Sequence, residues 1–144
     1  MTAAMHRAYA GRPLAAVGVV VTRADEVLLI RRGRPPLEGA WTLPGGAIEW
    51  GETAAQAAQR ELLEECHVCA RIERVLDVAD LIERDEQGKA RFHYVIVEFL
   101  ARYLSGQVRA DSDSADARWV PAADLQRYAL SPEVQRLIRL ALET

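Results

Sequence analysis

The chain has 144 residues, of which 50% are hydrophobic and 27% are charged, and its formal net charge is −3 at pH 7. These values are typical of one globular domain with a sizeable core, so we expect a single domain over residues 1–144. The weakly negative charge gives no reason to expect nucleic acid as a partner. No apolar run approaches the ~20 residues that span a bilayer, so we expect no membrane segment and a cytoplasmic protein.

The N-terminal part predicts a tail followed by two paired strands. Residues 1–12 are expected to form a loose tail. The β-branched run Leu14–Thr22 predicts a central strand rather than a signal-peptide core, because no clear cleavage site follows it. Val27–Arg32 predicts a second strand that pairs back as a hairpin, and Gly33–Gly39, which contains two prolines, predicts a loop.

The middle of the chain predicts short extended segments and then a helix. Trp41–Leu43 is expected to be extended, Pro44–Gly46 to turn the chain sharply, and Ala47–Glu49 to form a short strand. A helix is predicted over Thr53–Cys66, because its first residue forms a capping box with Gln56 and good helix formers follow.

The C-terminal part predicts further strands and a final helix. In chain order we expect a strand over Cys69–Val78, a polar loop or hairpin turn over Leu81–Ala90, a long strand over Arg91–Leu104, an acidic loop over Asp111–Asp116, a short strand over Ala117–Val120 and a short helix over Pro121–Tyr128. A last amphipathic helix is capped by Ser131, with one apolar face made of Val134, Leu137, Ile138 and Ala141. This order predicts the α+β class, with a mixed β-sheet sandwiched between helices.

The predicted middle helix carries a cluster of acidic residues. At about 100° per residue, Glu61, Glu64 and Glu65 fall on one arc. The three carboxylates repel one another, and a hard cation such as Mg²⁺ would remove that cost while keeping room for a phosphate ligand. The small side chains one turn back would leave a shallow floor that a substrate can approach: Ala54, Ala57 and Ala58. The alternative is an ordinary solvated face rich in glutamate.

The spacing of residues around this helix resembles the motif of a known enzyme family. Five residues separate Gly46 from Glu52, and seven more separate Glu52 from the run Arg60-Glu61-Leu62-Leu63-Glu64-Glu65. This string resembles the Nudix box, Gly-x5-Glu-x7-Arg-Glu-apolar-x-Glu-Glu-x-Gly-apolar, at every position but one. The departure is His67, where the family has the glycine that ends the helix, and histidine is among the residues that tolerate a positive φ.

The resemblance implies a fold, a reaction and a set of ligands. Nudix enzymes form an α/β/α sandwich and hydrolyse a nucleoside diphosphate linked to another group, with Mg²⁺ or Mn²⁺ as cofactor. Carried over by position, the metal ligands would be the carbonyl oxygen of Gly45 and the carboxylates of Glu61, Glu64 and Glu65. Arg60 would orient these glutamates and complete the catalytic group with Glu61 and Glu64.

Two further positions of the motif would have structural roles, since Gly46 and Glu52 would support the loop–helix arrangement. The general base varies within the family, so its identity is left open. Glu61 is the first candidate, and the second is either an acidic residue of Asp111–Asp116 or Glu98.

Several residues outside the motif are candidates for substrate binding. Arg31, Arg32 and Arg34 precede the segment that leads into the motif, and arginine presents a bidentate fork to phosphate. The alternative is a solvated strand end. Three aromatic residues could stack on a nucleobase, with core packing as the other interpretation of each: Trp41, Phe92 and Tyr94.

The substrate is predicted by resemblance alone. The segment Glu83–Gly106, together with Ala117–Pro121, resembles the Nudix group labelled ADP-ribose pyrophosphatase-like, which favours ADP-ribose or an ADP-sugar as a small-molecule substrate. The products would be a nucleoside monophosphate and a phosphorylated second product. A nucleoside triphosphate pyrophosphohydrolase is the alternative within the family. An alternative of another class is a non-catalytic Nudix ligand-binding or regulatory module, and pairing into a homodimer is also implied by the family.

Overall fold

The computed structural model describes residues 7–35, 37–111 and 113–143. The prediction of a loose tail over residues 1–12 therefore lies partly outside the described residues. In the part that is described, the backbone N–H of Tyr9 donates to the carbonyl of Arg91 at 2.7 Å, and its hydroxyl donates to Asp85 at 2.9 Å. No helix within these ranges is long and apolar enough to cross a membrane.

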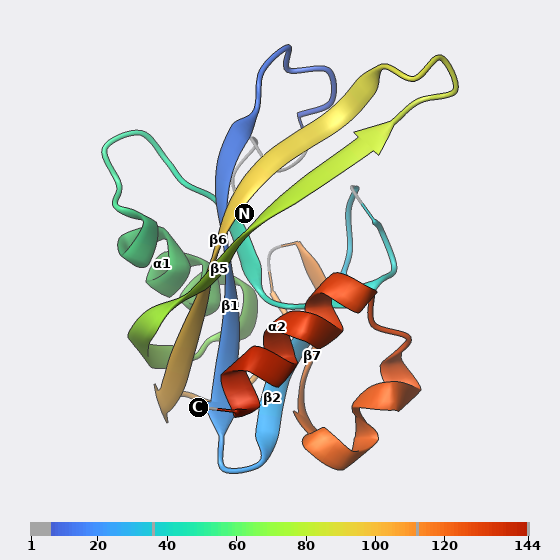
Figure 1. Ribbon diagram of the computed structural model, residues 1–144. Coiled ribbons are helices and arrows are strands. Elements are labelled where there is room, and N and C mark those ends of the chain that lie inside the picture. The colour runs from blue at the N-terminus through green and yellow to red at the C-terminus, as the bar shows by residue number, and fades with distance from the viewer. Residues whose placement is uncertain (1–6, 36, 112, 144) are drawn as a thin grey trace.

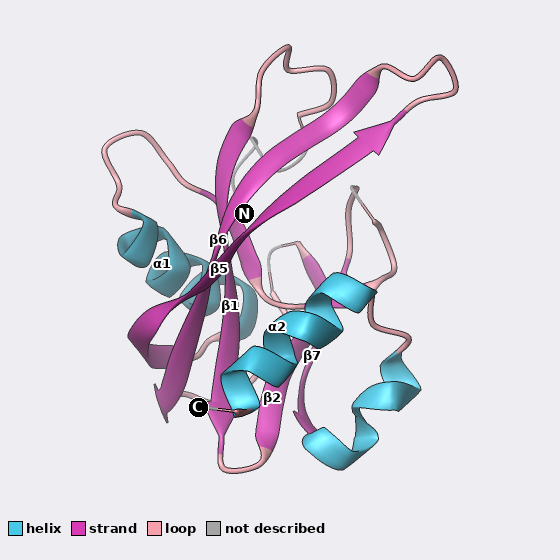
Figure 2. Cartoon of the chain, in the orientation of Figure 1, coloured by secondary structure: helices cyan, strands magenta, loops and turns pink. Residues whose placement is uncertain are grey.

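Seven strands of the described chain form one mixed sheet, which has a helix on each face (Figures 1 and 2). The spatial order is β3-β2-β1-β6-β5, with β4 paired to β1 and β7 paired to β2. The strands are β1 Leu14–Arg23, β2 Glu26–Arg32, β3 Trp41–Thr42, β4 Gly45–Ala47, β5 Cys69–Arg84, β6 Ala90–Ser105 and β7 Ser114–Pro121. The helices are α1 Ala54–Cys66, the 3₁₀ helix η2 Ala122–Tyr128, and α2 Pro132–Leu142. The predicted α+β class is confirmed.

The central strand β1 is bordered by different partners along its length. It runs parallel to β6 from the pair Leu14–Tyr94 to the pair Thr22–Arg102. On its other side it pairs with β2 only beside the hairpin turn, where Thr22 faces Val27. Farther along, β4 takes the place of β2 and pairs with Ala16–Gly18. The two hairpin strands therefore diverge, and the candidate site lies where they have separated.

Over Val19–Val21 the side chains of β1 alternate between two core clusters. Val19 packs on the α1 side together with Leu62 of the helix. Val20 packs on the other side with Leu137 of α2. The apolar face predicted for the last helix is confirmed, because Val134, Leu137, Ile138 and Ala141 are all buried. Both faces of β1 are covered, as its continuous apolar sequence requires.

The prediction of a sharp turn at Pro44–Gly46 followed by a strand at Ala47–Glu49 is wrong. Gly45–Ala47 is itself the strand β4, antiparallel to β1. A Cβ atom at Gly45 would collide with the carbonyl oxygen of Val17. Gly45 therefore allows the backbones of β4 and β1 to approach closely. A pair of glycines is equally common in a turn, so the sequence alone does not distinguish the two structures.

The predicted loop Leu81–Ala90 is too long, because β5 continues to Arg84. Leu81 pairs with Tyr94 across the β5–β6 hairpin, which extends beyond the rest of the sheet in Figure 1. The turn is short and is held by Asp85, whose carboxylate accepts from the backbone N–H groups of Gln87 and Lys89. Likewise β7 begins at Ser114, inside the predicted acidic loop.

Candidate active site

Helix α1 begins and ends as its sequence predicts. The Thr53 hydroxyl accepts from Gln56 N–H at 3.1 Å, and the Gln56 side chain accepts from Thr53 N–H at 2.9 Å, which completes the capping box. The helix ends at His67, which adopts the left-handed conformation with φ 60° and ψ 32°. The His67 ring lies 2.8 Å from the carboxylate of Asp111. Histidine therefore occupies the conformation for which the motif uses glycine.

The predicted shallow alanine floor is wrong. Ala57 and Ala58 are completely buried in the core between α1 and the sheet. The acidic residues beside them are buried as well, because Glu61 is 0% and Glu65 is 1% exposed. The small side chains bring the helix close to the sheet, so that the glutamates point inward rather than into solvent. Only Glu64 of the three is partly open, with its side chain 40% exposed.

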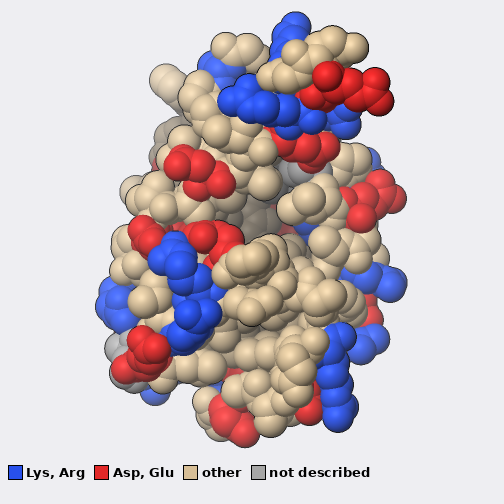
Figure 3. Space-filling model, turned by 45° about the vertical axis from the view of Figure 1, so that its right-hand side comes forward, with Lys and Arg blue, Asp and Glu red and all other residues tan. Residues whose placement is uncertain are grey.

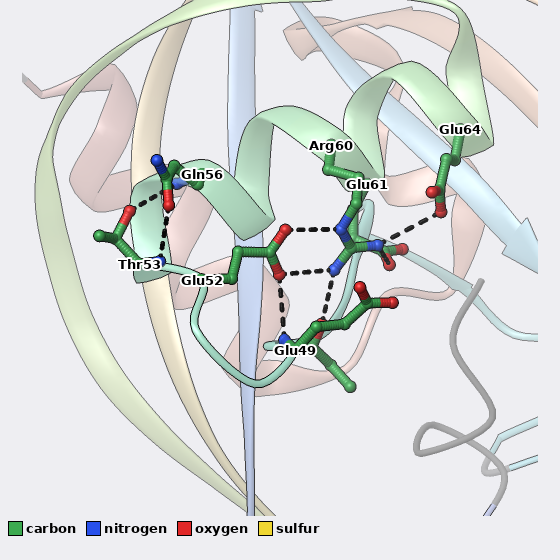
Figure 4. Close-up of polar contacts among 8 residues, drawn as sticks. Glu49, Glu52, Thr53, Gln56, Arg60, Glu61 and Glu64 are labelled. Atoms are coloured by element: carbon green, nitrogen blue, oxygen red, sulfur yellow. Dashed lines mark hydrogen bonds and ion pairs between the residues drawn. The ribbon is translucent and has the colours of Figure 1, made fainter.

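Arg60 is the centre of a network of acidic side chains (Figure 4). Its guanidinium donates to both carboxylate oxygens of Glu52, at 2.7 and 2.9 Å. It also donates to Glu61 at 2.6 Å and to Glu64 at 3.3 Å. The remaining bond, at 2.9 Å, goes to the carbonyl of Ala47 in β4. One planar cation therefore connects the helix, the preceding loop and the strand.

The buried pair Glu61 and Glu65 lies against β4. The N–H of Gly45 donates to Oε1 of Glu65 at 2.9 Å, and the Glu61 carboxylate fills the space where Gly46 would otherwise carry a side chain. Burial raises the pKa of Glu61 to about 7, although Arg60 lowers it. Burial, and then the charge of Glu61, raises the pKa of Glu65 to about 8. Both shifts show that negative charge is poorly compensated here.

The chemistry of these donors suits a divalent cation. Oε2 of Glu61 is buried and has no hydrogen-bond partner in the described chain. Carboxylate oxygens are hard donors of the kind that Mg²⁺ and Mn²⁺ prefer, and a cation would offset the charge that burial penalises. Within the described ranges, no three His, Cys, Asp or Glu side chains converge tightly enough to hold an ion as they stand.

The three arginines before the motif do not form one cluster. Arg32 is only 9% exposed and donates to the carbonyls of Arg34 and Pro35 at 3.3 and 3.4 Å. It lines a pocket with Gly45 and Gly46, whereas Arg34 forms an ion pair with Asp113 at 2.8 Å. Burial lowers the pKa of Arg32, and the nearby charge of Glu65 opposes that shift.

Arg31 lies apart from this pocket. Its guanidinium is 6.0 Å from the ring centre of Trp41, on the neighbouring strand. Trp41 packs edge-to-face against Tyr128, with ring centres 5.0 Å apart. Successive strand residues point to opposite faces, so Arg31 and Arg32 cannot share a ligand contact on one face.

The other two aromatic candidates belong to the core. Phe92 is 5% and Tyr94 is 0% exposed, and their rings stack with centres 6.4 Å apart. Sequence reasoning missed Gly18, which lies opposite Glu98 in the parallel ladder. A glycine inside an otherwise β-branched central strand was the available signal, because it marks a close approach by another group.

Ser114 was missed for a different reason. Its hydroxyl donates to the backbone carbonyl of Glu65 at 3.0 Å, and the N–H of Asp111 reaches the same carbonyl at 3.1 Å. Arg109, Asp111 and Ser114 thus satisfy carbonyls at the end of α1, where helices leave such groups unpaired. No local sequence signal marks a contact over this separation.

The fold and the site together define an α+β domain in which one acidic helix presents buried carboxylates beside a glycine-containing strand. The NUDIX domain model matches residues 12–141 of the chain. The chain belongs to the Nudix family, as its motif predicts, and the prediction of a Nudix pyrophosphohydrolase is confirmed at the level of the family.

Similar proteins agree with this assignment. An ADP-ribose pyrophosphatase of Methanocaldococcus jannaschii is 30% identical over 121 residues, which cover 84% of this chain and 69% of that protein. The human 8-oxo-dGDP phosphatase NUDT18 is 33% identical over 131 residues, 88% of this chain but only 38% of that protein. The crystal structure of a MutT NUDIX hydrolase from Burkholderia pseudomallei has a TM-score of 0.74 and 30% identity, covering 90% of this chain and 98% of that one.

Proposed function

We propose that this domain hydrolyses the diphosphate linkage of a nucleoside diphosphate derivative, with ADP-ribose or an ADP-sugar favoured. The products are a nucleoside monophosphate and a phosphorylated second product. The observation that carries the proposal is the buried pair Glu61 and Glu65, held beside Gly45 without enough positive charge to compensate it. Burying two carboxylates costs free energy, and a bound cation together with a phosphate ligand would offset that cost.

Mg²⁺ or Mn²⁺ is the proposed cofactor, with the carbonyl of Gly45 and the carboxylates of Glu61, Glu64 and Glu65 as its ligands. When bound, the cation supplies the charge that lets a diphosphate lie beside carboxylates, and it polarises the phosphorus centre. Arg60 holds Glu61 and Glu64 in place through bonds of 2.6 and 3.3 Å.

Glu61 is the proposed general base for the attacking water. Its Oε2 has no hydrogen-bond partner in the described chain, whereas Oε1 accepts from Arg60 at 2.6 Å. The competing acids are placed less favourably. Asp111 contacts His67, Asp113 is paired with Arg34, and Glu98 lies on the α2 side of the sheet.

The substrate class rests on the relatives and on charge. One relative is named for ADP-ribose and another for 8-oxo-dGDP, and both of these compounds contain a nucleoside diphosphate. On the face drawn in Figure 3, basic and acidic side chains are interspersed, which favours a small ligand over a nucleic-acid backbone. The second candidate is a nucleoside triphosphate pyrophosphohydrolase, which relatives named as putative 8-oxo-dGTP diphosphatases support. A cytoplasmic location is a proposal that rests on the sequence, and pairing into a homodimer is a proposal that rests on the resemblance to the family.

The test is metal-dependent turnover of a nucleotide panel by the wild-type protein and by Glu64→Gln. ADP-ribose, ADP-sugars, dinucleoside polyphosphates, NADH and the triphosphates would be offered with Mg²⁺ or Mn²⁺, and a phosphatase would be coupled to detect monophosphate products. We expect turnover of ADP-ribose that falls at least ~100-fold in Glu64→Gln. Glu86→Gln, in the exposed hairpin turn, is the control and should behave as wild type. Binding of ADP-ribose without turnover of any substrate would overturn the hydrolase in favour of a ligand-binding module.

A further inference from the structure

Glu98 is a buried acidic residue that the proposed reaction does not use. It lies in β6 and is only 6% exposed. Its partner in the parallel ladder is Gly18, and a Cβ atom at Gly18 would collide with the Glu98 carboxylate. The carboxylate therefore occupies the space above Gly18 that a side chain would otherwise fill.

No protein group in the described chain donates a hydrogen bond to Glu98 or forms an ion pair with it. Arg136, whose charge lowers the pKa of Glu98, is already engaged, because it donates to Asp77 at 2.7 Å and to Glu133 at 2.6 Å. Burial, and then the negative charges of Glu133 and Asp77, raises the pKa of Glu98 to about 7. A largely buried carboxyl group usually has a hydrogen-bond partner, so we expect a ligand or water to supply one for Glu98.

The carboxylate opens onto a pocket of about 90 Å³. Apolar side chains supply much of its wall, and they come from several elements: Leu43, Leu81, Ile96 and Val134. Gly45, Gly46 and Arg32 line the same pocket. Gly45 and Gly46 also contact the buried glutamates of α1, so the single strand β4 separates the pocket from the site where the diphosphate is proposed to bind.

This combination selects a particular kind of ligand group. Apolar walls suit the face of a flat ring, and a single carboxyl oxygen suits a hydrogen-bond donor at the ring's edge. A nucleobase with an exocyclic amino group has both features. A carboxyl group offers an acceptor oxygen in either protonation state, so this contact does not depend on the charge of Glu98.

We propose that Glu98 determines substrate specificity by accepting a hydrogen bond from the exocyclic amino group of the substrate's nucleobase. The proposal rests on the proposed function and names the group by which that site recognises its substrate. Phosphate contacts near Glu61 would position the ligand, and the contact with Glu98 would distinguish one base from another.

The test measures binding rather than turnover, so that it remains decisive if the hydrolase proposal fails. Isothermal titration calorimetry would compare two pairs of monophosphates that differ by one amino group. AMP is paired with purine riboside 5′-monophosphate, and GMP is paired with IMP. For the wild-type protein we expect the amino-bearing member of one pair to bind about tenfold more tightly.

Variants at Glu98 assign that preference to the residue. Glu98→Met removes the acceptor at similar size and should abolish the preference, whereas Glu98→Gln keeps a carbonyl acceptor and should retain it. Asp77→Asn is the matched control on the same face, and it should leave the preference unchanged. Melting curves check that each variant is folded. A preference that survives Glu98→Met, equal binding within both pairs, or no binding of any of the four nucleotides would overturn the proposal.

Discussion

The backbone N–H of Gly45 donates a 2.9 Å hydrogen bond to Oε1 of Glu65, so a strand of the sheet holds a carboxylate of the helix. The next strand residue, Gly46, leaves the space that the Glu61 carboxylate fills. The short strand β4 therefore positions both buried acids of the motif. The N–H of Gly45 and the ion pair between Arg60 and Glu61 compensate only part of the cost of burying two carboxylates, which makes the site sensitive to pH and to metal.

The stability of the metal-free protein should fall as the pH rises. The pKa values of Glu61 and Glu65 are raised from 4.5 to about 7 and about 8. The folded protein thus holds these protons more tightly than the unfolded chain, so their stabilising contribution is complete below pH 4.5 and is lost as the pH rises through 7 and 8. Each tenfold difference in proton affinity between the folded and unfolded states corresponds to about 1.4 kcal/mol of stability. Melting temperatures measured with EDTA across this range should therefore decrease.

Adding Mg²⁺ should reverse that trend, because the cation binds the deprotonated carboxylates and binds only the folded state. The increase in melting temperature with Mg²⁺ should be larger at about pH 8 than at about pH 5. Glu65→Gln should flatten the pH dependence and reduce the response to Mg²⁺. An equal response at both pH values would contradict the assignment of these carboxylates as ligands.

Arg60→Ala should destabilise the protein by about 3 kcal/mol, because it leaves Glu61 buried without its cation. It also removes the bond to the carbonyl of Ala47 that connects helix and strand. Arg60→Lys should recover only part of the loss, since an ammonium group cannot serve all these acceptors in the geometry of a planar fork. Urea denaturation gives the free energies. The adjacent exposed substitution Gln59→Ala should change stability by less than ~0.5 kcal/mol.

Gly46→Ala should cost roughly 1–3 kcal/mol, because the new methyl group enters the space of the Glu61 carboxylate. The double variant Gly46→Ala with Glu61→Ala should be less destabilised than the sum of the single variants, since the clash is then absent. Chemical denaturation of the four proteins measures the coupling. Strict additivity would show that the two positions do not compete for space.

His67→Gly and His67→Ala separate two opposing effects at the end of α1. Glycine relieves the cost of the left-handed conformation, about 1 kcal/mol, but loses the exposed contact with Asp111, which is worth less than that. We therefore expect His67→Gly to be neutral or stabilising by less than ~1 kcal/mol. His67→Ala keeps the backbone strain and loses the contact, so it should be destabilising. Urea midpoints rank the three proteins, and the reverse order would exclude backbone strain as the dominant effect.

Local features of the sequence determined much of this molecule. The capping box of Thr53 and Gln56, the left-handed end at His67, the β1–β2 hairpin and the apolar face of α2 are confirmed. Each depends on residues a few positions apart, whose hydrogen bonds and periodicity operate within one element or between two consecutive strands. The motif spacing likewise identified the family without any tertiary information.

Tertiary packing determined how those elements contact one another and which side chains they bury. The alternation of a strand separates Arg31 from Arg32, although they are adjacent in the chain. The glycines of β4 were expected to turn, and instead they allow the strand to pair with β1. Above all, the burial of Glu61 and Glu65 depends on how closely α1 packs on the sheet. The solvent exposure of a residue depends on the side chains and backbone that pack against it. Those partners can be distant in the sequence, so local patterns do not reveal them.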